Sequence, residues 1–64
     1  MKTGQMIRRI RQAKGVTQWQ LSQTVGVSPA RILLIERGDR DCPPELLAAI
    51  AKALNVREDA LRNK

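Results

Sequence analysis

Side chains suited to acid–base or metal chemistry are scarce in this chain. Its 64 residues include no histidine and a single cysteine, Cys42. The nearby acids Asp39, Asp41 and Glu45 are more simply explained as loop and helix-start residues than as catalytic bases. One cysteine without histidine also excludes an internal disulfide and the usual zinc sites. We therefore expect that the chain is not an enzyme and that it holds no metal or cofactor.

Basic side chains that can bind a polyanion are more abundant, and they are unevenly distributed. Residues 1–40 contain eight lysines and arginines against two acidic residues, whereas residues 41–64 contain four of each kind. The first of these two segments therefore carries all of the formal net charge of +6. A surface that only kept the protein in solution would not need this asymmetry, so the pattern favours a phosphate-facing surface.

The length and the apolar pattern predict one domain over residues 1–64 in a reducing cytoplasm. The chain has no apolar run near the roughly 18 residues of a membrane span, and its start lacks the apolar stretch of a signal peptide. We therefore expect no membrane partner. A domain of this size buries only about 60% of its unfolded surface, which predicts a stability on the order of a few kcal/mol.

The elements that must position the basic residues are clearest in residues 17–38. Thr17 and Gln20 have the types and spacing of a capping box, in which each side chain bonds the backbone N–H of the other residue. A helix is therefore predicted to begin there. Gly26 accepts a positive φ without a Cβ penalty, which predicts a tight turn after this helix.

A second short helix is predicted directly after the turn. Ser28 is a preferred N-cap, Pro29 suits the first helical position, and Gly38 suits the left-handed residue that ends a helix. Two helices joined by so short a turn must cross. This is the geometry of a helix-turn-helix unit, whose second helix enters the major groove of DNA.

The rest of the chain predicts three more helices and no strand, hence an all-α fold of five helices. One runs from about residue 4 to residue 14 with Thr3 as its cap, one begins at Pro44, and a short one spans 57–61. The expected core is aliphatic, because the chain has neither phenylalanine nor tyrosine. Its predicted members are Ile7, Ile10, Val16, Leu21, Val25, Val27, Ile32, Ile35, Leu47, Ile50, Ala51, Leu54 and Leu61.

The pattern as a whole resembles the phage-repressor class of helix-turn-helix domains, the Cro and lambda-repressor-like proteins that are also called the xenobiotic-response-element family. The resemblance covers residues 4–61. The residues that carry it in one register are Gln18, Ser22, Gly26, Ile32, Ile35, Glu36-Arg37-Gly38 and Ile50-Ala51-Lys52-Ala53-Leu54. It implies a compact five-helix domain that binds double-stranded DNA as a repressor-like transcriptional regulator of bacterial or phage origin. It also implies a homodimer on a palindromic operator, with half-sites about one helical turn apart.

The resemblance further implies phosphate contacts at two places. Gln18 and the free N–H groups at the start of its helix would hold one phosphate, with Thr17 beside them. Arg37 and Arg40 would bind a second phosphate cluster. Acidic residues alternate with these two arginines, which predicts weaker phosphate binding here than is usual in the family.

A structural ion pair is implied between Arg11 and Glu36. Both residues fall close to the core faces of their predicted helices, where an unpaired charge would be costly. The pair would lock the orientation of the second helix of the motif.

The second helix of the motif departs most from the resemblance. Its outward face carries Ala30, Leu33 and Leu34, flanked by Pro29 and Arg31. Relatives commonly place hydrogen-bonding side chains there. Only Arg31 can make the paired contact to guanine O6 and N7, worth about 1 to 3 kcal/mol of discrimination. Ala30 and Leu34 can press on thymine methyl groups, and the segment expected in the major groove is 29–36, with Ser28 at its start.

The same apolar face supports an alternative function. Trp19 lies outside the apolar stripe of its helix, and with Leu33 and Leu34 it would form one exposed patch of the kind that marks a protein interface. The chain would then be a protein-interaction or antitoxin-like module with a protein partner. Trp19 is equally well explained as a cap over the aliphatic stems of Gln23 and Leu33, and a sugar-phosphate contact is a third interpretation.

Overall fold

The computed structural model describes residues 2–62, and of Lys2 only the backbone. Regular structure within these residues is helical throughout and consists of α1 (Lys2–Ala13), α2 (Gln18–Val25), α3 (Pro29–Arg37), α4 (Pro44–Ala53) and α5 (Glu58–Leu61). The predicted all-α fold of five helices is therefore confirmed. The two ends of the domain expected over residues 1–64 lie outside the described residues.

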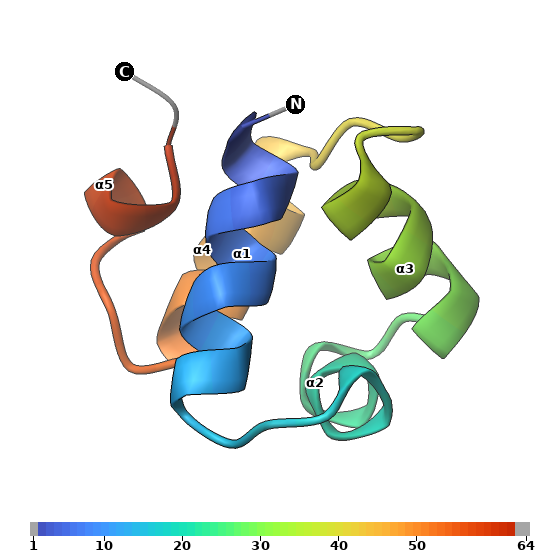
Figure 1. Ribbon diagram of the computed structural model, residues 1–64, viewed down its shortest axis with the longest axis horizontal. Coiled ribbons are helices and arrows are strands. Elements are labelled where there is room, and N and C mark those ends of the chain that lie inside the picture. The colour runs from blue at the N-terminus through green and yellow to red at the C-terminus, as the bar shows by residue number, and fades with distance from the viewer. Residues whose placement is uncertain (1, 63–64) are drawn as a thin grey trace.

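The helices surround one aliphatic core (Figure 1). Helix α3 packs against α1 and α2, α4 packs against α2 and α5, and α5 also contacts α1. As a result α3 and α5 lie on opposite sides of α1 in Figure 1. The buried apolar residues are Ile7, Leu21, Ile32, Ile35, Leu46, Leu47, Ile50, Ala51, Leu54 and Leu61.

The start of α2 has the predicted capping box. The backbone N–H of Gln20 donates to Oγ1 of Thr17 at 3.0 Å, and the backbone N–H of Thr17 donates to Oε1 of Gln20 at 2.9 Å. These two bonds satisfy N–H groups that have no partner inside the helix. Helix α2 then ends at Gly26, whose φ of 78° is the left-handed conformation expected of the turn.

The start and end of α3 also follow the sequence signals. Oγ of Ser28 accepts a hydrogen bond from the backbone N–H of Arg31 at 3.2 Å, and Pro29 occupies the first helical position. Gly38 ends the helix with φ 85°. The helix-turn-helix predicted over residues 17–38 is therefore present, and its second helix is one residue longer than the expected 29–36.

Helix α1 begins earlier than expected. It starts at Lys2, so Thr3 lies within the helix, and the prediction that Thr3 caps it was wrong. At Gly4, α1 and α3 meet so closely that a Cβ would overlap the carbonyl oxygen of Ile35 and lie 3.0 Å from that of Glu36. This contact packs the first turn of α1 directly against the C-terminal end of α3.

The last two helices differ from the prediction in smaller ways. Leu46 is buried although the single apolar stripe did not include it, because α4 packs against both α2 and α5. Helix α5 begins at Glu58, one residue later than expected. Four predicted core residues, Ile10, Val16, Val25 and Val27, are only partly buried at the edge of the core. Among the described residues, no helix is long and apolar enough to cross a membrane.

Candidate nucleic-acid interface

Arg11 and Glu36 fix the angle between α1 and α3. Nε of Arg11 donates to Oε2 of Glu36 at 2.6 Å, and its Nη2 donates to Oε1 at 3.1 Å. The two residues are only 7% and 4% exposed. The remaining Nη1 of Arg11 donates to the backbone oxygen of Val16 at 2.8 Å, which also ties down the turn before α2. The structure thus brings together the two charges for which the sequence predicted an ion pair.

Gln18 joins the same network from α2. Its Nε2 donates to Oε1 of Glu36 at 3.1 Å, so this amide does not point only outward as expected. An amide nitrogen carries two N–H groups, and one remains for a ligand at the start of α2. The hydrogen bond holds Gln18 half-buried beside the free backbone N–H groups of that helix end. No local sequence signal predicted this bond, because it joins residues 18 positions apart.

Basic side chains lie exposed at the C-terminal end of α3. Arg37 and Arg40 are both exposed, as a role in binding phosphate requires. Nε of Arg37 lies 3.3 Å from Oδ2 of Asp39, and the two side chains remain 61% and 50% exposed. An ion pair this exposed contributes little to stability, but it competes for the charge of Arg37.

The outward face of α3 is apolar over its first turns. Pro29, Ala30 and Leu33 are exposed, and Leu34 is half-buried. On the opposite face Ile32 and Ile35 are buried in the core. The predicted division of this helix into a core face and an outward face is therefore present.

Arg31 lies at the edge of this outward face and is half-buried. Its Nε is buried and has no hydrogen-bond partner among the residues that the structure describes. Its positive charge acts on Cys42 in the loop between α3 and α4. Burial raises the pKa of the Cys42 thiol, and the charge of Arg31 offsets part of that increase. The guanidinium group of Arg31 is therefore near enough to this loop for its charge to act on the thiol.

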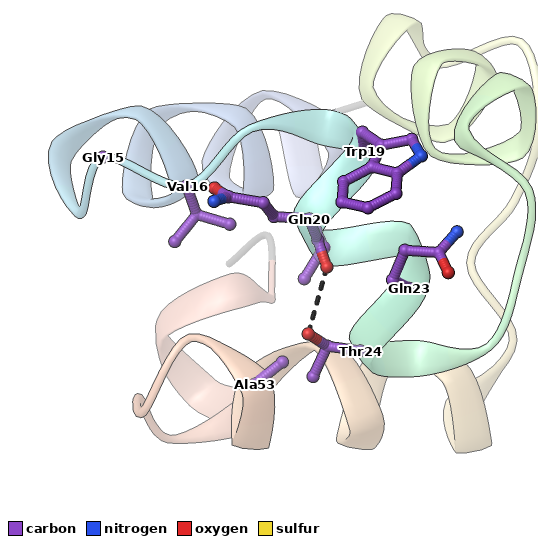
Figure 2. A pocket seen from close by; sticks show the side chains of 8 residues that line it. Gly15, Val16, Trp19, Gln20, Gln23, Thr24 and Ala53 are labelled. Carbon is purple, nitrogen blue, oxygen red and sulfur yellow. Dashed lines mark hydrogen bonds between the residues drawn. The ribbon is translucent and has the colours of Figure 1, made fainter.

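Trp19 is the most exposed large apolar residue of the described chain, at 62%. Figure 2 shows its ring beside a shallow groove of about 490 Å³. The residues that line this groove with Trp19 are Gly15, Val16, Gln20, Leu21, Gln23, Thr24 and Ala53. They come from the turn before α2, from α2 itself and from the end of α4. Trp19 was expected to cover the aliphatic stems of Gln23 and Leu33. Of these two residues, Gln23 lines the same groove as Trp19.

Two side-chain hydroxyl groups of α2 donate hydrogen bonds to the backbone of the same helix. Ser22 is fully buried, and its hydroxyl donates to the backbone oxygen of Trp19 at 2.6 Å. The hydroxyl of Thr24 donates to the backbone oxygen of Gln20 at 3.0 Å, the dashed line in Figure 2. Ser22 is thus enclosed by the packing of α2, and its hydroxyl is satisfied within its own helix.

Comparison with known proteins places this arrangement in a family. The family model HTH_3, described as helix-turn-helix, matches residues 7–61. Among curated proteins, no sequence matches the chain significantly.

Solved structures match over nearly the whole chain. The restriction-modification controller protein C.AhdI from Aeromonas hydrophila has a TM-score of 0.91 and 31% identity, over 95% of this chain and 92% of that one. The P22 c2 repressor protein, solved in complex with a synthetic operator, has a TM-score of 0.87 and 34% identity, over 95% and 92%. SinR, a master regulator for biofilm formation solved in complex with DNA, has a TM-score of 0.84 and 28% identity, over 92% and 95%.

These relatives are a controller, a repressor and a regulator, so the family is one of regulators and not of enzymes, as the sequence predicted. The matched segment contains the capped helices α2 and α3 and the Arg11–Glu36 pair that orients them. The chain belongs to the HTH_3 family of helix-turn-helix proteins and shares the lambda-repressor-like fold of its solved members.

Proposed function

We propose that this protein is a repressor-like transcriptional regulator that binds double-stranded DNA in a sequence-specific manner, with α3 in the major groove. The observation that carries the proposal is that α3 exposes one face while the buried Arg11–Glu36 pair fixes its orientation from behind. Two relatives of the same fold were solved with an operator and with DNA. A fixed helix with an exposed face is what major-groove docking requires.

Phosphate contacts would flank this helix on both sides. The start of α2 offers backbone N–H groups, the second amide N–H of Gln18 and the hydroxyl of Thr17. The end of α3 offers the exposed guanidinium groups of Arg37 and Arg40. The contacts to base edges would come from the residues at the start and on the outward face of α3, namely Ser28, Pro29, Ala30, Arg31 and Leu34.

We also infer that the protein acts as a homodimer in the cytoplasm, where its DNA would lie. One short helix touches only a few base pairs, and a dimer on a palindromic operator doubles the contacts at half-sites about 34 Å apart. A protein-interaction module that uses Trp19 and Leu33 is the alternative, favoured only by the exposure of these two side chains.

Two experiments in sequence test the proposal. Bound sequences are selected from a random duplex pool, and the most enriched duplex is then titrated with the protein at several salt concentrations. Each phosphate contact should contribute about −0.9 to the slope of log affinity against log salt. Arg37→Ala should weaken binding on every sequence and reduce the slope by about one contact. The exposed Arg57 directly precedes α5, which lies on the opposite side of α1 from α3 in Figure 1, and it offers the matched control Arg57→Ala.

The expected outcome is enrichment of a palindrome and a steep salt dependence that Arg37→Ala reduces and Arg57→Ala does not. A salt-independent affinity, or equal effects of the two variants, would contradict binding through the α2–α3 face. A single unrepeated half-site in the enriched sequences would contradict the homodimer alone.

A further inference from the structure

The outward face of α3 lacks the polar side chains with which a helix usually distinguishes base pairs. Pro29 and Ala30 are exposed and have no side-chain donor or acceptor, and neither have Leu33 and Leu34. The hydroxyl of Ser28 lies at the N-cap, before the first turn, where its oxygen accepts from the backbone N–H of Arg31 and its O–H remains free to donate. The first two turns of α3 therefore offer apolar contact at their centre.

Only one feature of the major-groove edge of DNA is apolar. Thymine carries a methyl group at C5, whereas the other groups at that edge are hydrogen-bond donors and acceptors. An apolar side chain that covers this methyl group removes it from water, which favours binding. The same side chain gains no such burial from a base that lacks the methyl group. The complementary ligand of this helix face is thus a pyrimidine methylated at C5.

We propose that α3 discriminates between base pairs mainly through the C5 methyl group of pyrimidines, which Ala30 and Leu34 contact in the major groove. This inference rests on the proposed DNA-binding function and names what that site distinguishes. It extends to 5-methylcytosine, because that base presents the same methyl group at the same position as thymine.

The spacing of the two residues defines the arrangement of the methyl groups. Ala30 and Leu34 are four positions apart and lie on one face of the helix. They are separated by about 6 Å along its axis, close to two base-pair steps of about 3.4 Å. Each half-site should therefore contain two methyl-bearing positions close together.

Arg31 does not occupy the centre of this face. Its side chain is half-buried, its Nε is enclosed by protein, and its charge acts on Cys42 in the loop after α3. Arg31 is placed to read at most the edge of the site. This leaves the methyl contacts as the main source of discrimination along the centre of the helix.

Single replacement of thymine by uracil in the selected duplex tests the inference, because it removes one methyl group and preserves base pairing. Affinity should fall about fourfold per methyl group at one or two positions of each half-site, the effect expected of one buried methyl. At the same positions 5-methylcytosine paired with guanine should bind about fourfold more tightly than cytosine. Uracil placed outside the selected site should have no effect.

Two variants separate the helix face from the rest of the protein. Leu34→Gln keeps the side-chain size and should remove the uracil effect at one position, while salt-dependent binding persists. Trp19→Ala, on the groove beside α4, should leave the uracil effect unchanged. The uracil measurement uses the unaltered protein, so it stands even if a variant folds poorly.

Equal binding of the thymine and uracil duplexes would overturn methyl recognition, and so would a uracil effect that is unchanged at every position in Leu34→Gln. In both cases, binding that still weakens with salt would leave the proposed DNA-binding function intact. A complete absence of duplex binding would overturn both the function and this inference.

Discussion

The amide of Gln18 and the carboxylate of Glu36 are joined by a hydrogen bond of 3.1 Å. Because Glu36 is also held by Arg11, the first residue of α2 is tied to the buried pair that orients α3. A phosphate that bound Gln18 would thus contact an amide already fixed in place. The proposed phosphate contact and the orientation of the reading helix depend on the same carboxylate.

Replacement of Gln18 by alanine should weaken DNA binding about tenfold on every sequence alike, because it removes one hydrogen bond to a charged phosphate. It should also lower the free energy of unfolding by about 1 kcal/mol, because the bond to Glu36 is lost. Fluorescence anisotropy and urea denaturation measure the two effects. The exposed Gln12 of α1 provides the control Gln12→Ala, and altered sequence preference in Gln18→Ala would contradict a phosphate contact.

The Arg11–Glu36 pair should be much more important for folding than for DNA contact. Replacing either residue alone by alanine leaves a buried charge without its partner, which should cost about 3 to 5 kcal/mol of unfolding free energy. Urea denaturation of Arg11→Ala and Glu36→Ala measures this loss. The double variant Arg11→Met with Glu36→Leu removes both charges and should recover most of the stability. Single variants that unfold like the parent would show that the pair is dispensable.

Gly4 should tolerate no side chain, because α1 and α3 approach each other at this residue. A Cβ there would overlap a backbone oxygen of Ile35, which cannot move without displacing α3. Gly4→Ala should therefore cost about 3 kcal/mol of unfolding free energy. Gly26 has open space around it and a φ of 78°, so Gly26→Ala should cost only about 1 to 2 kcal/mol of conformational strain. Equal losses in thermal or urea denaturation would contradict the close approach.

The boundaries of α2 and α3 could be predicted because their signals are local. Thr17 and Gln20 are three residues apart and complete a capping box between themselves, and Ser28 caps α3 through a similarly short contact. Such bonds form in the same way wherever the helix packs. The ion pair of Arg11 and Glu36 was expected for a different reason, the resemblance to a family.

The features that escaped prediction depend on how helices meet. The bond between Gln18 and Glu36 joins the start of α2 to the end of α3, so it depends on how these two helices pack. The same is true of Gly4, since nothing in its sequence neighbours distinguishes a point of close approach from an ordinary helical glycine. For Arg31 the sequence indicated its position at the edge of the face, but not the burial of its Nε.

Removal of the carboxylate of Asp39 should strengthen DNA binding. Asp39 pairs with Arg37 at 3.3 Å in the free protein, so a phosphate must compete for that guanidinium group. Asp39→Asn keeps the side-chain shape and should raise affinity about threefold, within the range of about 0.2 to 1 kcal/mol for exposed pairs. The exposed Asp59 of α5 gives the control Asp59→Asn, which changes the net charge equally on the opposite side of α1 (Figure 1). Equal gains from both variants would show a general charge effect.

Arg31 should specify one guanine per half-site at the edge of the α3 face. Arg31→Ala should lower the preference for that guanine by about fivefold, the lower end of the range of about 1 to 3 kcal/mol for a paired contact and less than the two methyl contacts of α3 together. Arg31→Lys keeps the charge but lacks the planar fork of donors, so it should lose the preference and retain the salt dependence. Unchanged preference in Arg31→Ala, measured by competition between duplexes, would exclude direct recognition by this residue.

The thiol of Cys42 reports on the position of Arg31 without any DNA. The charge of Arg31 lowers the pKa of Cys42 against the larger effect of burial, so Arg31→Ala should raise this pKa further. The thiolate is the reactive form, and a higher pKa leaves less of it at any pH below that value. Alkylation of Arg31→Ala at mildly alkaline pH should therefore be slower than that of the parent, and Arg31→Lys should be close to the parent. Faster alkylation in Arg31→Ala, with folding intact, would show that Arg31 shields the thiol by contact and does not act through its charge.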